Sequence, residues 1–68
     1  SDTPLRIARV ESGKTLETVA RSVGVSKGYL SRVECGLQRP SPTLTEKLSR
    51  FFGTVSEIEI LYPERFTK

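Results

Sequence analysis

The sequence contains no histidine, and Cys35 is its only cysteine. Histidine is the side chain used most often for general acid–base catalysis, so the chain lacks the usual partner for a nucleophile. A single cysteine forms neither an internal disulfide nor, by itself, a metal site. No phosphate-binding loop and no pair of carboxylates at catalytic spacing stands out either. The sequence therefore indicates a protein that is not an enzyme and that has no catalytic residues, metal site or cofactor.

Long apolar segments are also missing from the sequence. No run approaches the ~18 apolar residues that a membrane-spanning helix needs, and no signal peptide is visible. Isolated cysteines are typical of reducing compartments. We therefore expect a cytoplasmic protein that does not contact a membrane.

The chain has 68 residues, enough for one small domain or for a fragment that contains one. A domain of this size buries only about 60% of its unfolded surface, which favours a helical fold with a small core. Residues 1–40 carry the whole net charge of +3, with seven bases and four acids, whereas residues 41–68 carry four of each. A basic excess suits a surface that binds a polyanion, although many domains without such a surface carry as much charge.

The most informative segment is residues 15–36, which predicts two short helices joined at a glycine. Apolar residues recur in its first half with helical spacing, at Leu16, Val19, Ala20 and Val23. Gly24 follows this stripe, and glycine readily adopts the positive φ that ends a helix. Ser26 then offers a side-chain oxygen to the first free N–H groups of a second helix.

In the second helix Leu30, Val33 and Leu37 are expected to face inward. The residues expected on the opposite face are Lys27, Gly28, Ser31 and Arg32. Two helices joined by such a short turn form the helix-turn-helix, which lays its second helix in the major groove of DNA. Ala20 is the small residue expected where the two helices approach most closely.

An ordered set of residues resembles the signature of the Cro/CI-type (XRE) helix-turn-helix repressors. The matching residues are Arg9, Thr15, Ala20, Gly24, Val25, Ser26, Ser31, Glu34, Gly36, Pro40 and Ser41. Residues 15–36 also resemble the lac-repressor family, but chains of that family begin almost at this segment and continue into a hinge. Here residues 5–11 predict a helix before the segment, and a helix begun by Pro-Ser follows it, so the flanks favour the Cro/CI type.

The resemblance implies an all-α fold, a compact five-helix bundle of the lambda-repressor-like DNA-binding type. We expect a single domain over residues 1–68 with the helix-turn-helix at residues 15–36. The first helix is expected to start at Thr3 and Pro4, and the fourth at Ser41 or Thr43. The fifth is expected to start at Ser56 and to end before residue 63.

Four residues at the start of the second helix-turn-helix helix are expected to contact base edges. Lys27 and Arg32 can donate to O6 and N7 of guanine, although two solvated charges would give the same pattern. Gly28 has two interpretations: it lets the backbone approach a base pair closely, or its small cost near a helix start is simply tolerated. Ser31 is placed equally well for a base contact or for packing.

A second group is expected to contact DNA phosphates, at Lys14, Thr15, Leu16, Ser26, Tyr29 and Arg39. Members of the family usually have an apolar residue at the position of Lys14 and a glutamine at the position of Leu16. The polar and the apolar residue are therefore exchanged in this sequence. Leu16 is therefore also a candidate core residue, and Lys14 a substitute phosphate ligand. The free N–H groups at the helix start can hold a phosphate whatever the side chain. Two of these residues have an alternative role. The Tyr29 side chain would instead cover the edge of the core, and Arg39 would instead be a solvated charge without a phosphate contact.

The resemblance also implies a structural ion pair between Arg9 and Glu34, which would hold the first helix against the third. The alternative for Arg9 is an ordinary surface base.

The fifth helix and the tail, residues 56–68, are expected to form a homodimer interface. Its residues would be Ile58, Ile60, Leu61, Tyr62 and Phe66. Ile60 lies off the main apolar stripe, so we expect it to leave exposed apolar surface. The alternative is that Ile60 and Phe66 fold back onto a small core. A dimer would place two recognition helices about 34 Å and ten base pairs apart, which suits an inverted repeat.

The sequence thus predicts a regulator of transcription that binds double-stranded DNA sequence-specifically, most simply a homodimeric repressor. The alternative is a module that binds a protein partner. An antitoxin that binds its toxin would be one case, and the DNA-binding part of a larger regulator with a fused sensing domain another.

Overall fold

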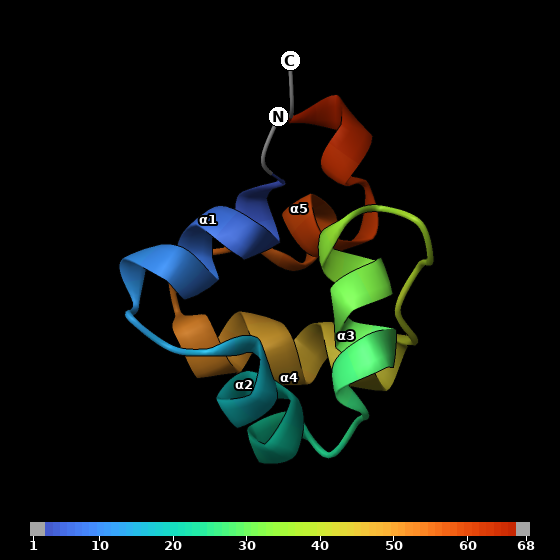
Figure 1. Cartoon of the computed structure of the whole chain (residues 1–68). Coiled ribbons are helices and arrows are strands. Elements are labelled where there is room, and N and C mark those ends of the chain that lie inside the picture. The colour runs from blue at the N-terminus through green and yellow to red at the C-terminus, as the bar shows by residue number, and fades with distance from the viewer. Residues whose placement is uncertain (1–2, 67–68) are drawn as a thin grey trace.

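The computed structural model describes residues 3–66, which form five α-helices and one turn of 3-10 helix (Figure 1). The elements are α1 (Pro4–Glu11), α2 (Leu16–Val23), α3 (Lys27–Glu34), α4 (Pro42–Phe52), α5 (Glu57–Leu61) and η1 (Pro63–Arg65). The described part of the chain contains no strand. The predicted all-α, five-helix fold is therefore confirmed.

Each α-helix begins directly after a serine or threonine that caps it. The caps are Thr3, Thr15, Ser26, Ser41 and Ser56. In every case the side-chain oxygen accepts a hydrogen bond from the backbone N–H three residues later, which satisfies one donor that the helix cannot pair internally. Ser56, where the fifth helix was expected to start, forms a full capping box with Glu59. The fourth helix begins at the first of its two expected caps.

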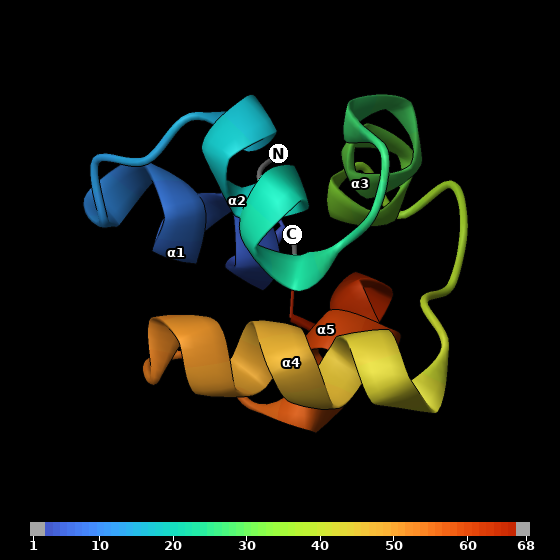
Figure 2. The same ribbon diagram turned by 90° about the horizontal axis from the view of Figure 1, so that it is seen from below.

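The helices enclose one apolar core. Its buried members are Leu5, Ala8, Val19, Ala20, Val23, Leu30, Val33, Leu44, Leu48, Val55 and Ile60. Figure 2 shows α4 running across one side of the molecule, with α2 and α3 packed on the other. No helix among residues 3–66 is long and apolar enough to cross a bilayer.

Leu37 does not face inward, contrary to the sequence prediction: 78% of its surface is exposed. The helical spacing that aligned it with Leu30 and Val33 stops when α3 ends at Glu34. Gly36 then adopts φ +80, which turns the chain away from the helical path.

Ile60 is also placed differently from the prediction, because only 2% of its surface is exposed. It belongs to the apolar core, so it leaves no apolar surface for a partner to cover. The alternative, in which the residue folds back onto the core, holds for Ile60 but not for Phe66, which is 47% exposed. A five-residue helix such as α5 is too short for its periodicity to distinguish the two sides.

Candidate nucleic-acid interface

The turn between α2 and α3 is built by three residues. Gly24 ends α2 with φ +79, and the N–H of Val25 donates to the carbonyl of Ala20 at 3.0 Å. Val25 is half-buried against the core, and Ser26 caps α3 at once. Ala20 is itself buried. The two helices are therefore fixed relative to each other by the core and by this hydrogen-bonded turn.

The outer side of α3 faces solvent. Lys27, Gly28 and Arg32 are exposed, and Ser31 is half-buried. Figure 1 shows α3 at one edge of the molecule, and in Figure 2 it lies on the side away from α4. The four residues expected to contact bases thus lie on one helix, with both cations exposed.

Arg32 is held on this surface by a hydrogen bond to the loop that follows α3. Its Nε donates to Oε1 of Gln38 at 3.0 Å. A Cβ added to Gly28 would lie 3.6 Å from Nη1 of Arg32, so the arginine side chain passes beside Gly28. The backbone of Gly28 has no positive φ, and that distance is an ordinary contact, so nothing within the domain requires glycine there. Sequence reasoning missed Gln38, because its place beside Arg32 depends on the turn at Gly36.

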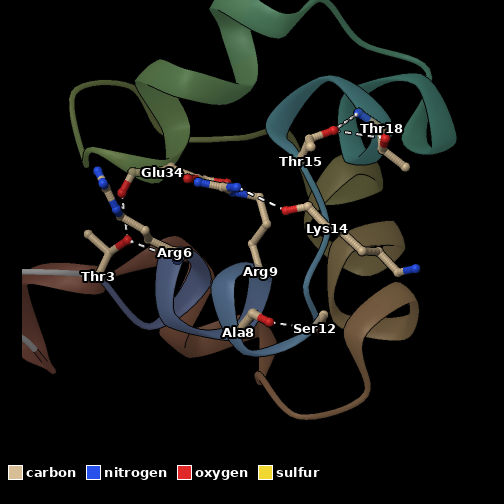
Figure 3. Close-up of polar contacts among 9 residues, drawn as sticks. All are labelled: Thr3, Arg6, Ala8, Arg9, Ser12, Lys14, Thr15, Thr18 and Glu34. Carbon is tan, nitrogen blue, oxygen red and sulfur yellow. Dashed lines mark hydrogen bonds and ion pairs between the residues drawn. The ribbon is translucent and has the colours of Figure 1, made fainter.

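The residues at the start of α2 differ in exposure. Lys14 and Thr15 are exposed, whereas Leu16 is half-buried against the core. The ammonium group of Lys14 lies 5.8 Å from the centre of the Phe51 ring. Thr15 caps α2, and its hydroxyl also donates to Oγ1 of Thr18 at 2.8 Å (Figure 3). The side chain of Leu16 thus occupies a packing position, which leaves its backbone N–H as the group able to meet a phosphate.

Ser26 and Tyr29 adjoin the outer side of α3. Ser26 is exposed, and its hydroxyl oxygen accepts the N–H of Tyr29 at 3.2 Å. Tyr29 is half-buried and packs against the core. Its position is compatible with both interpretations made from the sequence.

Arg39 is bound by the C-terminal segment of the chain. Its Nη2 lies 3.2 Å from Oε2 of Glu64, its Nη1 donates to the carbonyl of Leu61, and its guanidinium lies 4.8 Å from the centre of the Tyr62 ring. The guanidinium of Arg65 lies 4.7 Å from the same ring. The pKa of Glu64 is lowered, first by a hydrogen bond from its own backbone N–H and then by Arg39. Sequence reasoning missed Glu64, which lies 25 residues from its partner.

Arg9 and Glu34 connect α1 to the end of α3. Nε of Arg9 lies 2.7 Å from Oε2 of Glu34, and the two side chains are only 16% and 5% exposed. Nη1 of Arg9 donates to the carbonyl of Lys14 at 3.0 Å, and the Thr3 hydroxyl donates to the carbonyl of Glu34 (Figure 3). The structure thus brings the two residues together, and their contacts orient α3 relative to α1 and to the loop before α2.

The surface expected to form a dimer is only partly apolar and exposed. Ile58 is 53% exposed and Phe66 47% exposed, while Leu61 and Tyr62 are half-buried. Residues 67–68 of the expected interface lie outside the described residues. Since Ile60 is in the core, the exposed apolar area of this segment comes from its other members.

Comparison with known proteins gives a family match that spans the candidate interface. A family model described as "Helix-turn-helix domain" matches residues 4–60. Two sequences of "Transcriptional regulator ClgR", from two strains of Mycobacterium tuberculosis, are each 50% identical to the chain over 40 residues. The aligned part is 59% of this chain and 36% of each relative, so the chain spans well under half the length of these curated relatives. No solved structure matches the chain.

Proposed function

The chain belongs to the helix-turn-helix domain family, as one of the XRE type, and from this premise we propose that it binds double-stranded DNA and regulates transcription. The observation that carries the proposal is the outer side of α3, where Lys27 and Arg32 are both exposed. A helix of this kind fits the major groove. There the two cations would donate to O6 and N7 of guanine, with Gly28 and Ser31 beside them.

Contacts to phosphates would fix the register of α3 on the duplex. We assign them to the start of α2, with Lys14, Thr15 and the backbone N–H of Leu16, and to Ser26 and Tyr29 at α3. We also assign one to Arg39, whose guanidinium keeps N–H groups beyond those that bind Leu61 and Glu64. As part of the same proposal the protein is a cytoplasmic repressor that covers a promoter, since a domain bound to promoter DNA can block transcription simply by occupying the site.

The roles of two arginines provide the direct test. DNA fragments selected from a random pool by the wild-type domain would give its preferred site. We expect Arg32→Ala to reduce the preference at one base-pair position by about 5- to 100-fold, because one base contact is lost. We expect Arg39→Ala to weaken all sequences alike and to lower the slope of affinity against salt by about one.

The control for this test is Arg50→Ala, on α4 at the opposite side of the molecule (Figure 2). It removes the same charge from a surface that the proposal keeps away from DNA. If Arg32→Ala and Arg39→Ala both bound the selected site with wild-type affinity and preference, the assignment of the two surfaces would be wrong.

We further propose that the domain acts as a homodimer through Ile58, Leu61, Tyr62 and Phe66, with Ile60 supporting this surface from the core. We expect Ile58→Glu to convert the dimer to a monomer in sedimentation equilibrium, because a charge would replace apolar area in the interface. Val10→Glu is the matched control, since Val10 is also an exposed β-branched apolar residue, 59% exposed against 53% for Ile58, but lies on α1. A wild-type domain that stays monomeric at high micromolar concentration, with and without its selected DNA, would contradict the proposal.

The alternative function, a module that chiefly binds a protein partner such as a toxin, makes a different prediction. Such a module would show weak binding to the random pool and no preferred sequence, so the same selection distinguishes it from a sequence-specific regulator. The DNA-binding part of a larger regulator would instead show a preferred sequence, like the function proposed above.

A further inference from the structure

The loop after α3 returns beside the helix that it leaves. Gly36 has φ +80, and the N–H of Leu37 donates to the carbonyl of Arg32 at 2.9 Å. This turn directs Gln38 back along α3, to a position beside a residue six places earlier in the chain. The result is the hydrogen bond of 3.0 Å from Nε of Arg32 to Oε1 of Gln38.

The side chain of Arg32 extends toward the start of α3. Side chains on a helix lean toward its N-terminus, and Nη1 of Arg32 accordingly lies 3.6 Å from the Cβ position of Gly28. The arginine side chain is thus placed along the outer side of α3, between Gly28 at the first turn and Gln38 in the following loop.

This placement decides which donors of Arg32 remain for a ligand. A guanidinium has five N–H groups, of which Nε carries one. Because Gln38 accepts that one, Nη1 and Nη2 keep theirs. These two nitrogens lie at the end of the guanidinium, where they can donate one hydrogen bond each to O6 and N7 of guanine.

From these contacts we propose that Gln38 is a positioning residue. It holds Arg32 in the orientation that binds guanine, and Gln38 itself does not contact DNA. A long exposed side chain loses conformational freedom when it binds, and a side chain already held by a neighbour loses less. Gln38 therefore increases the discrimination that Arg32 provides. The inference rests on the proposed function of α3, because it concerns the same contact.

The experiment compares binding to the selected DNA site with binding to a site in which the base pair read by Arg32 is replaced. Gln38→Ala is expected to reduce discrimination at that position by about 3- to 10-fold and to leave preferences at the other positions unchanged. Gln38→Glu keeps an acceptor for Nε, so discrimination is retained, while its added negative charge weakens binding to every sequence alike. Unfolding curves of both variants should match that of the wild type, because the side chain of Gln38 is exposed.

A second set of variants separates positioning from direct contact. In the Arg32→Ala background, Gln38→Ala should have no further effect on discrimination, because the group that it positions is gone. A further loss there, or wild-type discrimination in the single Gln38→Ala variant, would overturn the inference while the proposed function stands. If the wild-type domain showed no sequence preference, or if Arg32→Ala changed none, the proposed function and this inference would both fall.

Discussion

Replacing Glu34 with alanine is expected to lower the free energy of unfolding by about 3 kcal/mol. The carboxylate of Glu34 is almost completely buried and lies 2.7 Å from Nε of Arg9. Its removal leaves the guanidinium without its charged partner, in a position where water reaches only a small part of it. The Arg9 side chain is 16% exposed, so this value lies at the low end for a broken buried pair. Urea denaturation of both proteins would measure the difference.

The control is Glu46→Ala on α4. Glu46 also pairs with an arginine, Arg50 at 3.2 Å, but both side chains are largely exposed. Such a pair contributes about 0.5 kcal/mol or less, so the same substitution should barely change the midpoint of denaturation. If the two variants were equally stable, the contact of Glu34 with Arg9 would not be holding α1 against α3.

Leu30→Ala is the second substitution with a large expected effect, about 3 kcal/mol of destabilisation. None of the surface of Leu30 is exposed. The shorter side chain would leave a cavity that the surrounding helices fill only in part. Domains of this length have little stability to lose, so a substantial fraction of Leu30→Ala should be unfolded at 37 °C, measurable by circular dichroism.

Leu37→Ala makes the same chemical change seven residues later and is the matched control. Because Leu37 is 78% exposed, its replacement should alter the free energy of unfolding by less than about 0.5 kcal/mol. A loss as large as that of Leu30→Ala would mean that Leu37 is buried, as its spacing from Leu30 and Val33 predicts. The pair of variants therefore tests where the helical pattern of α3 stops.

The helix boundaries were the most predictable part of the fold, because they depend on short-range chemistry. Ser26 caps α3 and Gly24 ends α2 through bonds to residues at most a few places away. Leu37 and Ile60 were misplaced because periodicity says which side a residue takes only while the helix continues and is long enough. Neither the turn at Gly36 nor the packing of α5 can be read from spacing alone.

The candidate site was predictable in its residues but not in its contacts. Helical spacing places Lys27 and Arg32 on the outer side of α3, and both are exposed there. The contact of Arg9 with Glu34 was expected only through the family resemblance, since nothing local joins residues 25 positions apart. The partners of Arg32 and Arg39 were missed because they depend on the tertiary path of the loop after α3 and of the C-terminal segment.

The binding of Arg39 by Leu61, Tyr62 and Glu64 joins two surfaces that the proposals treat separately. Leu61 and Tyr62 belong to the surface proposed to contact the partner protomer. Arg39 belongs to the group proposed to contact DNA phosphates. The Arg39 guanidinium thus contacts the segment proposed to pair the subunits and is itself proposed to bind a phosphate. Under these proposals, dimerisation and binding to DNA phosphates are thermodynamically linked. The factor by which DNA changes the affinity between subunits must equal the factor by which dimerisation changes the affinity for DNA.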